Sequence, residues 1–379
     1  MLQWQGQNVF TASADGVLRL WASSADGKEW KTVENVPFHP RMSVSALVEA
    51  DGTVFCGYEA PFPLALSPGE AAAAASAAAA AGSAAGNGGA AAAAGAPPPV
   101  TVGMIRTIRG SDGVQSEAIV DLATTPYAHT RKVTALALGT NDAGSLLFSG
   151  GEEGFVRVWQ QRDGKLVAAG ELPGHVRGVT AMVATQGLLW TASRDTTIRV
   201  WNMSTAGCIG VIGAASGGGH RGEVTCLAYM PDPDKAAAAA AAGGGAAAAA
   251  GLTGGHVLSA SLDHTIRVWN AGDGTSAYEF DAKEAVTALA CVPVSSAGPL
   301  ILYGLQNGSV AIRDYPGFGL AFELLHAFYH VGHSRPVRAI LPLAMPTTAA
   351  GGPLYFASAD DSGKMCMWEL ALPPGFSQS

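Results

Sequence analysis

The sequence contains few groups of residues whose types and spacing could support catalysis or metal binding. The one compact group of histidines is His326, His330 and His333 in HAFYHVGH, and three histidines at that spacing could bind a metal. No cysteine or carboxylate joins them, and His333 also fits a position that recurs along the chain. The chain lacks a G-x-S-x-G motif, a Cys–His signature and an unassigned carboxylate pair. GFGL at Gly317 is not followed by the helix that a phosphate loop needs. We therefore expect no enzyme, no bound metal and no cofactor.

Two decapeptides in the chain are almost identical. SRDTTIRVWN covers residues 193–202 and SLDHTIRVWN covers residues 261–270, and eight of the ten letters agree. Counted back from the tryptophan, an acid lies six residues earlier and a hydroxyl lies ten residues earlier. This frame is found four times, in Thr11/Asp15/Trp21, Ser149/Glu153/Trp159, Thr191/Asp195/Trp201 and Ser259/Asp263/Trp269. The chain is therefore built from a repeated unit.

Three degenerate copies bring the number of repeats to seven. In QNGSVAIRD, Asn307 takes the place of the acid and Arg313 that of the tryptophan; DSGKMCMW ends at Trp368, and Ile108 stands for the tryptophan in VGMIRTIRGSDG. Trp159 and Trp201 are 42 residues apart (201 − 159), and a period of about 40–45 residues is typical of β-propellers. The copies read as short apolar strands separated by Gly, Asp or Asn turns. We predict an all-β fold, a seven-bladed propeller, whose closure leaves no long free sheet edge.

The repeat resembles that of the WD-repeat family over essentially the whole chain outside two low-complexity tracts. A histidine precedes the first strand of several copies, in Ala128-His129, Gly174-His175, Gly219-His220 and Gly332-His333. In that family the leading histidine joins the hydroxyl, the acid and the tryptophan in a buried network. The resemblance implies a structural role for His129, His175 and His220 together with the frame residues of their repeats, and for Thr11, Asp15 and Trp21 in the first repeat. A buried carboxylate needs such donors, and the tryptophan adds apolar area and one N–H.

Within the family, the chain is most similar to plant proteins that join a CCCH zinc finger to a WD-repeat propeller. The similarity lies in VAIRDYPGF, in LYFASADDSGKMCMW and in the degenerate second repeat. The chain has no Cys/Cys/Cys/His finger of its own, so RNA binding by a finger is not carried over to it.

Both ends of the repeat array look one strand short. The first copy starts with QNVFTAS, which reads as a second strand, and the last copy ends in LALPPGFSQS without a clear outer strand. We therefore predict that the first and last blades each lack a strand. We interpret the chain as N-terminally short, because both strands would lie upstream of Met1; an open or self-completed ring is the alternative.

Two Ala/Gly-rich tracts interrupt the repeats, at about residues 68–99 in the second blade and 232–253 in the fifth. The first lies between the second and third strands of its blade, and the other between the first and second strands. Poly-Ala can form a helix, but the interspersed Gly and Ser favour flexible linkers. We treat residues 1–379 as a single propeller domain that carries two inserts.

Composition limits the class of protein. The formal net charge of −8 (22 − 30) argues against a surface that coats nucleic acid generally. No apolar run reaches a membrane span of about 18 residues without being poly-Ala, and MLQWQGQ has no signal-peptide pattern. Five scattered cysteines without a C-x-x-C pair are typical of reduced thiols. We expect an intracellular protein, cytoplasmic or nuclear, with no membrane partner and no small-molecule substrate.

A basic residue recurs just after the leading histidine, in the turn before the first strand. Six of seven repeats have one, namely Arg41, Arg131, Arg177, Arg221, Lys283 and Arg335, and Arg194 and Arg338 add to the same side. Ring symmetry would gather these cations around one face, called the top face, and they would suit an anionic partner. The alternative is ordinary solvated turns that local acids such as Glu152, Glu223 and Glu284 neutralise.

The expected function is that of a non-enzymatic scaffold or adaptor that binds a protein or peptide through top-face loops. An acidic or phosphorylated peptide fits the cations, and RNA is a further candidate. Two alternatives stay open: an RNA-associated WD-repeat protein whose zinc finger lies upstream of this chain, and a substrate receptor of a ubiquitin ligase.

Overall fold

The computed structural model describes most of the repeat array. The described residues are 2–4, 8–13, 15, 17–24, 29–37, 43–50, 53–61, 101–110, 119–141, 144–162, 165–185, 187–214, 218–232, 255–292, 299–315, 317–324, 332–343 and 353–371. Both Ala/Gly-rich tracts lie outside them, the first between β6 (Thr53–Pro61) and β7 (Thr101–Gly110), and the second between β17 (Val224–Met230) and β18 (His256–Ser261) except for Asp232. No helix in these ranges is long and apolar enough to cross a membrane.

Every regular element is a strand, and the strands form seven antiparallel sheets, numbered here as blades in chain order. Blade 1 contains β1 (Leu2–Trp4), β2 (Asn8–Ala12), β3 (Val17–Ser23) and β4 (Trp30–Pro37). Blade 2 contains β5 (Ser43–Ala50), β6, β7 and β8 (Ile119–His129). Blade 3 contains β9 (Val133–Asn141), β10 (Gly144–Gly151), β11 (Val156–Arg162) and β12 (Lys165–Leu172).

The second half of the ring follows the same plan. Blade 4 contains β13 (Val179–Thr185), β14 (Leu188–Ser193), β15 (Ile198–Asn202) and β16 (Cys208–Ile212). Blade 5 contains β17, β18, β19 (Thr265–Asn270) and β20 (Ser276–Asp281). Blade 6 contains β21 (Val286–Val292), β22 (Leu300–Leu305), β23 (Val310–Asp314) and β24 (Leu320–Leu324), and blade 7 contains β25 (Val337–Leu343), β26 (Leu354–Asp360) and β27 (Met365–Leu370).

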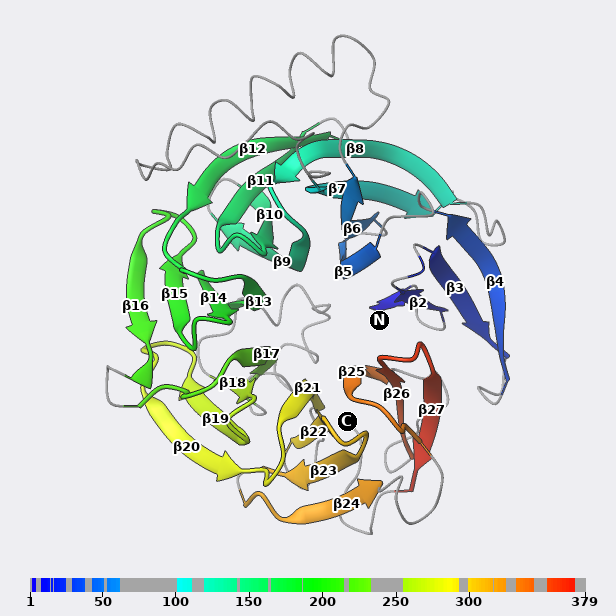
Figure 1. The fold of residues 1–379 in the computed structure, drawn as a ribbon, viewed down its shortest axis with the longest axis vertical. Coiled ribbons are helices and arrows are strands. Elements are labelled where there is room, and N and C mark those ends of the chain that lie inside the picture. Colours follow the sequence, from blue (N-terminus) through cyan, green and yellow to red (C-terminus); the bar gives the residue numbers. More distant parts are fainter. Residues whose placement is uncertain are drawn as a thin grey trace, which may run out of the picture.

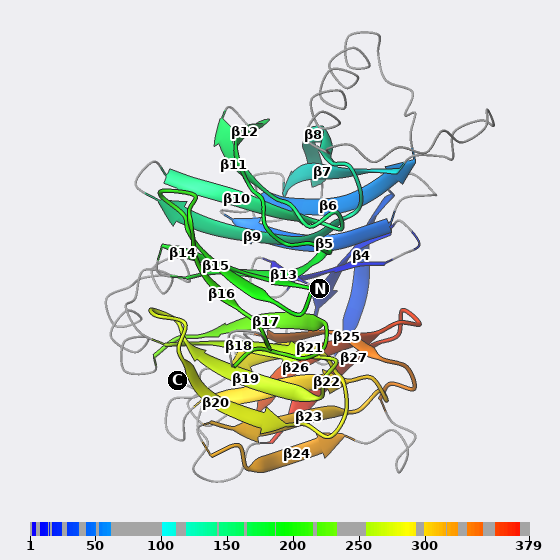
Figure 2. The ribbon, with the colours of Figure 1, turned by 60° about the vertical axis from the view of Figure 1, so that its left-hand side comes forward.

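The sheets stand around a central axis, and in blades 2 to 6 the first strand lies nearest the axis and the fourth at the rim (Figure 1). Neighbouring sheets stack face to face (Figure 2). The core consequently lies between blades: one apolar cluster joins Phe148 to Trp201, and another joins Val310 to Phe356. Val9 packs with Ala357, so blade 1 also meets blade 7. The predicted all-β propeller with seven blades is confirmed.

Burial explains why the second strands read as continuous apolar runs. The side chains of β22 are buried along its whole length, and all but the first residue of β14 and of β18 are buried. Each of these strands is covered on both faces by the neighbouring sheets, so no position has to be polar. The outer strand β20 is exposed at five of its six residues and reads SAYEFD.

A bulge recurs near the start of six innermost strands. The pairing register shifts after the first valine of β5, β9, β13, β17, β21 and β25, in a V-[S/T]-[A/C] sequence or, in β25, Val-Arg-Ala. The bulged residue is Ser45, Thr134, Thr180, Thr225 or Thr287, and its hydroxyl donates to the backbone carbonyl of the corresponding valine in the next blade. Four of the five bonds measure 2.5–2.7 Å and Ser45 makes the fifth. A hydroxyl thus links each of five consecutive blades to the next.

The prediction that both end blades lack a strand is wrong for blade 1. Leu2–Trp4 forms β1, which pairs antiparallel with β2 through Leu2↔Phe10 and Trp4↔Asn8. Three connecting residues are enough for a hairpin, but a three-residue strand is too short to show a period in the sequence. Within the described residues the sheet of blade 7 has three strands, and for this blade the missing strand stays a prediction.

Candidate functional site

Blade 4 brings a histidine, a carboxylate, a hydroxyl and an indole together. Nδ1 of His175 lies 3.0 Å from Oδ2 of Asp195, and Nε2 lies 2.8 Å from the hydroxyl oxygen of Thr191. The indole N–H of Trp201 donates to the same hydroxyl oxygen at 2.9 Å. Thr191 and Trp201 lie on a diagonal across β14 and β15, Thr191 opposite Arg199 and Trp201 opposite Leu189, and this register explains their fixed spacing of ten residues.

Blades 5 and 3 repeat the arrangement. In blade 5 the two nitrogens of His220 lie 3.1 Å from the carboxylate of Asp263 and 2.7 Å from the hydroxyl of Ser259, which accepts from Trp269 at 2.8 Å. In blade 3 the corresponding set is His129, Glu153, Ser149 and Trp159, with 2.5 Å between Nδ1 and Oε1. The structure thus joins the residues that the resemblance assigned to the network in these three blades.

Hydrogen bonds keep the carboxylates of the blade 4 and blade 5 networks, Asp195 and Asp263, ionised. Burial by itself would raise the pKa of Asp195, but bonds from the ring of His175 and from the hydroxyl and N–H of Thr197 outweigh it, so the pKa lies well below its usual value. The pKa of Asp263 is lowered in the same way, by His220 and Thr265. An ionised carboxylate can only accept, so Nδ1 of each histidine carries the proton.

The networks have the residue types of a Ser-His-Asp hydrolase but not its access. A catalytic hydroxyl must reach the substrate, whereas Thr191, Ser149 and Ser259 have no exposed surface and lie under their tryptophans. These sets hold the turn between the second and third strands to the turn before the first strand. They therefore position the top face and provide no accessible nucleophile.

Blade 7 contains a fourth network that the sequence frame missed. His333 binds Asp360 at 3.1 Å and the hydroxyl of Ser358 at 2.6 Å, and Trp368 donates to that hydroxyl at 2.7 Å. The acid lies eight residues before the tryptophan, two earlier than in blade 4, and Ser362 stands at the usual acid position and donates to Asp360. The unchanged ten-residue spacing from hydroxyl to tryptophan was the signal that could have found it.

Blades 1 and 6 keep only parts of the pattern. In blade 1, Thr11 accepts from Trp21 at 2.8 Å, and Asp15 forms an ion pair with Arg19 at 2.6 Å in place of a histidine. In blade 6, Arg313 stands where the tryptophan does elsewhere. Its Nε donates to the hydroxyl of Tyr303, again ten residues earlier, at 2.7 Å.

Two sets of turns meet on the top face. In five blades a backbone N–H of the turn after the second strand donates to a carbonyl of the turn before the first strand. The pairs are Glu152 to Lys132, Arg194 to Gly178, Leu262 to Glu223, Gln306 to Ala285 and Asp361 to Pro336. Residues from both sets of turns therefore lie together, as the prediction of a common face requires.

Seven of the cations predicted to lie on this face are described, and four of them form ion pairs with acidic side chains. Arg194 pairs with Glu152 of blade 3 at 3.1 Å, and Arg177 pairs with Glu223 of blade 5 at 3.2 Å, so these pairs connect neighbouring blades. The two pairs within a blade are Lys283 with Asp281, at 2.6 Å, and Arg338 with Asp361. All four pairs have exposed members, so each contributes little to stability.

The other three cations stand free of acids within the described ranges. Arg131, Arg221 and Arg335 are exposed, come from blades 3, 5 and 7, and form no ion pair there. Arg41 lies outside the described residues, as do His326 and His330. Among the described residues no group of three potential ligands could hold a metal ion.

Exposed apolar side chains lie among these charges. Val176, directly after His175, is 83% exposed, and Phe155 and Leu262 in neighbouring turns are each 38% exposed. The turn of Phe155 touches the loop of Val176, because a Cβ on Gly154 would lie 2.7 Å from the carbonyl oxygen of His175. Apolar groups rimmed by charges are typical of protein-binding surfaces.

Comparisons with known proteins agree with this architecture. The family "WD domain, G-beta repeat" matches residues 121–160, 164–202 and 247–270. The chain is 26% identical over 265 residues to the pre-rRNA-processing protein IPI3 of Yarrowia lipolytica, covering 63% of this chain and 52% of that protein. It is 28% identical over 245 residues to zinc finger CCCH domain-containing protein 17 of Oryza sativa subsp. japonica, covering 64% of this chain and 46% of that protein.

Among solved structures, the WD40 propeller of Doa1 superposes with a TM-score of 0.58 at 15% identity, over 95% of this chain and 88% of that one, a likeness of fold alone. The chain spans about half the length of the curated relatives it matches. The repeated networks, the ring of sheets and these matches agree: the chain contains WD repeats and folds as a WD-repeat β-propeller.

Proposed function

We propose that the protein is a non-enzymatic scaffold that binds another protein through its top face. The observation that carries the proposal is the set of three exposed arginines, Arg131, Arg221 and Arg335, which no acid neutralises within the described residues. They come from three blades of one ring, beside the exposed apolar groups Phe155 and Val176. Such a surface suits an acidic or phosphorylated segment that also carries an apolar anchor.

Association with RNA is the second candidate. It is favoured by the relatives, one of which is named a pre-rRNA-processing protein and another a CCCH zinc finger protein. The same arginines could contact phosphates of an RNA backbone. Against it stands the net charge of −8, because a protein that binds RNA along its surface is normally basic.

We place the protein inside the cell, in the cytoplasm or the nucleus. All five cysteines, Cys56, Cys208, Cys226, Cys291 and Cys366, are free thiols. Burial raises the pKa of Cys226 to about 11, so this thiol stays protonated and unreactive at neutral pH. Free thiols without disulfides are usual in a reducing compartment.

Partner capture with charge-reversed variants tests the function. Wild type and an Arg131→Glu, Arg335→Glu double variant are used as bait in extract of the source cells, with and without ribonuclease. The matched control is Arg162→Glu with Lys31→Glu, which makes the same charge change at exposed sites away from the top-face turns. We expect the top-face variant alone to lose partners, and the loss to be independent of ribonuclease. Equal partner sets for all three proteins would refute the proposal, and capture abolished by ribonuclease would favour RNA.

A further inference from the structure

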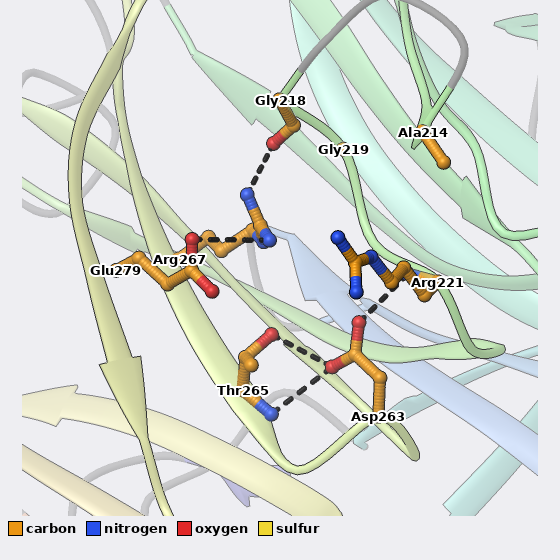
Figure 3. A pocket seen from close by; sticks show the side chains of 8 residues that line it. All are labelled: Ala214, Gly218, Gly219, Arg221, Asp263, Thr265, Arg267 and Glu279. Atoms are coloured by element: carbon orange, nitrogen blue, oxygen red, sulfur yellow. Dashed lines mark hydrogen bonds and ion pairs between the residues drawn. The ribbon is translucent and has the colours of Figure 1, made fainter.

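A polar cavity of about 460 Å³ opens between blades 4 and 5 (Figure 3). Its lining comes from the connection that leads into blade 5 and from the third and fourth strands of that blade: Ala214, Gly218, Gly219, Arg221, Asp263, Thr265, Arg267 and Glu279. Two of these are arginines, and in Figure 3 their guanidinium groups point toward each other across the cavity. The lining also holds two carboxylates: Asp263 accepts from Thr265 and from the backbone N–H of Arg221, and Glu279 pairs with Arg267.

Arg267 is held in place with part of its hydrogen-bonding capacity unused. It lies on β19, two residues before Trp269, and is 9% exposed. One terminal nitrogen donates to the carbonyl of Gly218, and the other lies 3.1 Å from the half-exposed carboxylate of Glu279. Its Nε is buried and has no hydrogen-bond partner among the described residues. The Nε of Arg199, the counterpart in blade 4, is also without a hydrogen-bond partner among the described residues, so the unused donor is shared by the two blades and the second arginine distinguishes blade 5.

Arg221 supplies the second guanidinium from the opposite wall. Its backbone N–H donates to Asp263 at 2.8 Å, and so the blade 5 network that contains His220 fixes the place where the side chain starts. Within the described ranges the exposed guanidinium forms no ion pair. It is therefore able to bind a ligand without first breaking a salt bridge.

The pair of arginines is a feature of blade 5 and not of the repeat. Blade 4 has Arg199 at the position of Arg267, and it lies against Gly174 much as Arg267 lies against Gly218 and Gly219. The residue after the leading histidine, however, is Val176 in blade 4 and Arg221 in blade 5. In blades 3 and 7 this residue is Thr130 and Ser334. Among blades 3, 4, 5 and 7, whose leading histidines are described, blade 5 alone has the pair, so the pair is not part of the network that these blades share.

We propose that this cavity binds a phosphate group carried by a protein partner, with Arg221 and Arg267 as its ligands. A phosphate monoester has three terminal oxygens and close to two negative charges and can accept from both guanidinium groups at once, whereas a carboxylate has two oxygens and a single charge. Glu279 holds Arg267 while the cavity is empty and swings to solvent when phosphate enters. The assignment of the phosphate to a protein partner rests on the proposed function, whereas the phosphate site is argued from the cavity alone.

Calorimetric titration of the full chain with inorganic phosphate tests the site, with acetate as a second ligand at equal ionic strength. We expect one phosphate site per chain and weaker binding of acetate. Arg221→Gln and Arg267→Gln should each weaken phosphate binding at least about tenfold, because each removes a charge-assisted contact. Arg199→Gln, the matched control in blade 4, and Arg162→Gln, at an exposed site away from the cavity, should leave it unchanged. Glu279→Gln should strengthen it severalfold, because the competing carboxylate is gone.

Three results would overturn the assignment: no phosphate binding to the folded chain, phosphate binding that survives both Arg221→Gln and Arg267→Gln, or acetate binding as tight as that of phosphate. Arg221 is exposed and Glu279 is half-exposed, so their variants keep the test decisive if Arg267→Gln fails to fold. Failure of the top-face proposal is separate. Arg131 and Arg335 do not line the cavity, so partner capture can fail while phosphate still binds, and the reverse.

Discussion

Replacing Thr191 by valine removes one oxygen from the middle of the blade 4 network and leaves its shape almost unchanged. The hydroxyl oxygen accepts from the indole of Trp201 and bonds to the ring of His175, and both partners are buried. The variant leaves two buried polar atoms without partners, and each costs about 1–3 kcal/mol. The expected loss of stability is about 2–6 kcal/mol.

Thr11→Val in blade 1 is the internal control. Thr11 accepts from Trp21 in the same geometry but has no histidine beside it, and the site is only partly buried. One polar atom loses its partner and water can reach it, so the expected cost is about 1 kcal/mol. Urea unfolding followed by tryptophan fluorescence measures both, and Thr191→Ser should restore most of the loss. Equal midpoint shifts for the two valine variants would show that the histidine adds nothing to the network.

Three further predictions concern the same fold. Asp263 has a lowered pKa in the folded protein, so its contribution to stability is complete above the unfolded value near 3.9 and is lost as the pH falls below it; urea midpoints between about pH 6 and pH 3 should fall more steeply for wild type than for Asp263→Asn. Thr225→Val should cost about 1 kcal/mol by removing a bond to blade 6, and Thr225→Ser should restore it in the same assay. Trp201→Ala should cost about 3–5 kcal/mol, and Trp368→Ala less, because Trp368 is only partly buried; similar midpoints for the two alanine variants would contradict this ranking.

The sequence predicted the repeat well because the repeat is made by contacts across one hairpin. The hydroxyl and the tryptophan lie on a diagonal across adjacent strands, so their spacing of ten residues cannot change without shifting the register of the pair. The acid sits in the turn, where the backbone can deliver a carboxylate from two positions. Asp195 and Asp360 use different ones; in the seventh copy the acidic pair Asp360 and Asp361 was identified as shifted by a residue or two, but the network that Asp360 makes with His333 was not predicted.

The spacing of hydroxyl, acid and tryptophan within one repeat could not predict the contacts between blades. The bond from Arg194 to Glu152 spans 42 residues and that from Arg177 to Glu223 spans 46, and the sequence shows which acids are near but not which cations they neutralise. The bulged hydroxyls are different. The triplets VSA and VTA can be read in the sequence, but the sequence does not show that their hydroxyls donate to a backbone carbonyl of the next blade. The facing of Arg221 and Arg267 likewise depends on how blade 4 passes into blade 5.

The row of bulged hydroxyls decides where the ring should open first. In a circular array each blade depends on its two neighbours, so the seam with the fewest bonds sets the lowest free energy for partial unfolding. In blade 7 the hydroxyl position is taken by Arg338, which turns back to Asp361 of its own blade. That residue cannot make the bond to blade 1 that a threonine would offer. The five hydroxyl bonds join blades 2 to 7, so among the described residues the two seams of blade 1, with blade 7 and with blade 2, have no such bond. Amide protons of β2 and β25 should therefore exchange with solvent water sooner than those of β13 and β17, and the ring should open first at blade 1.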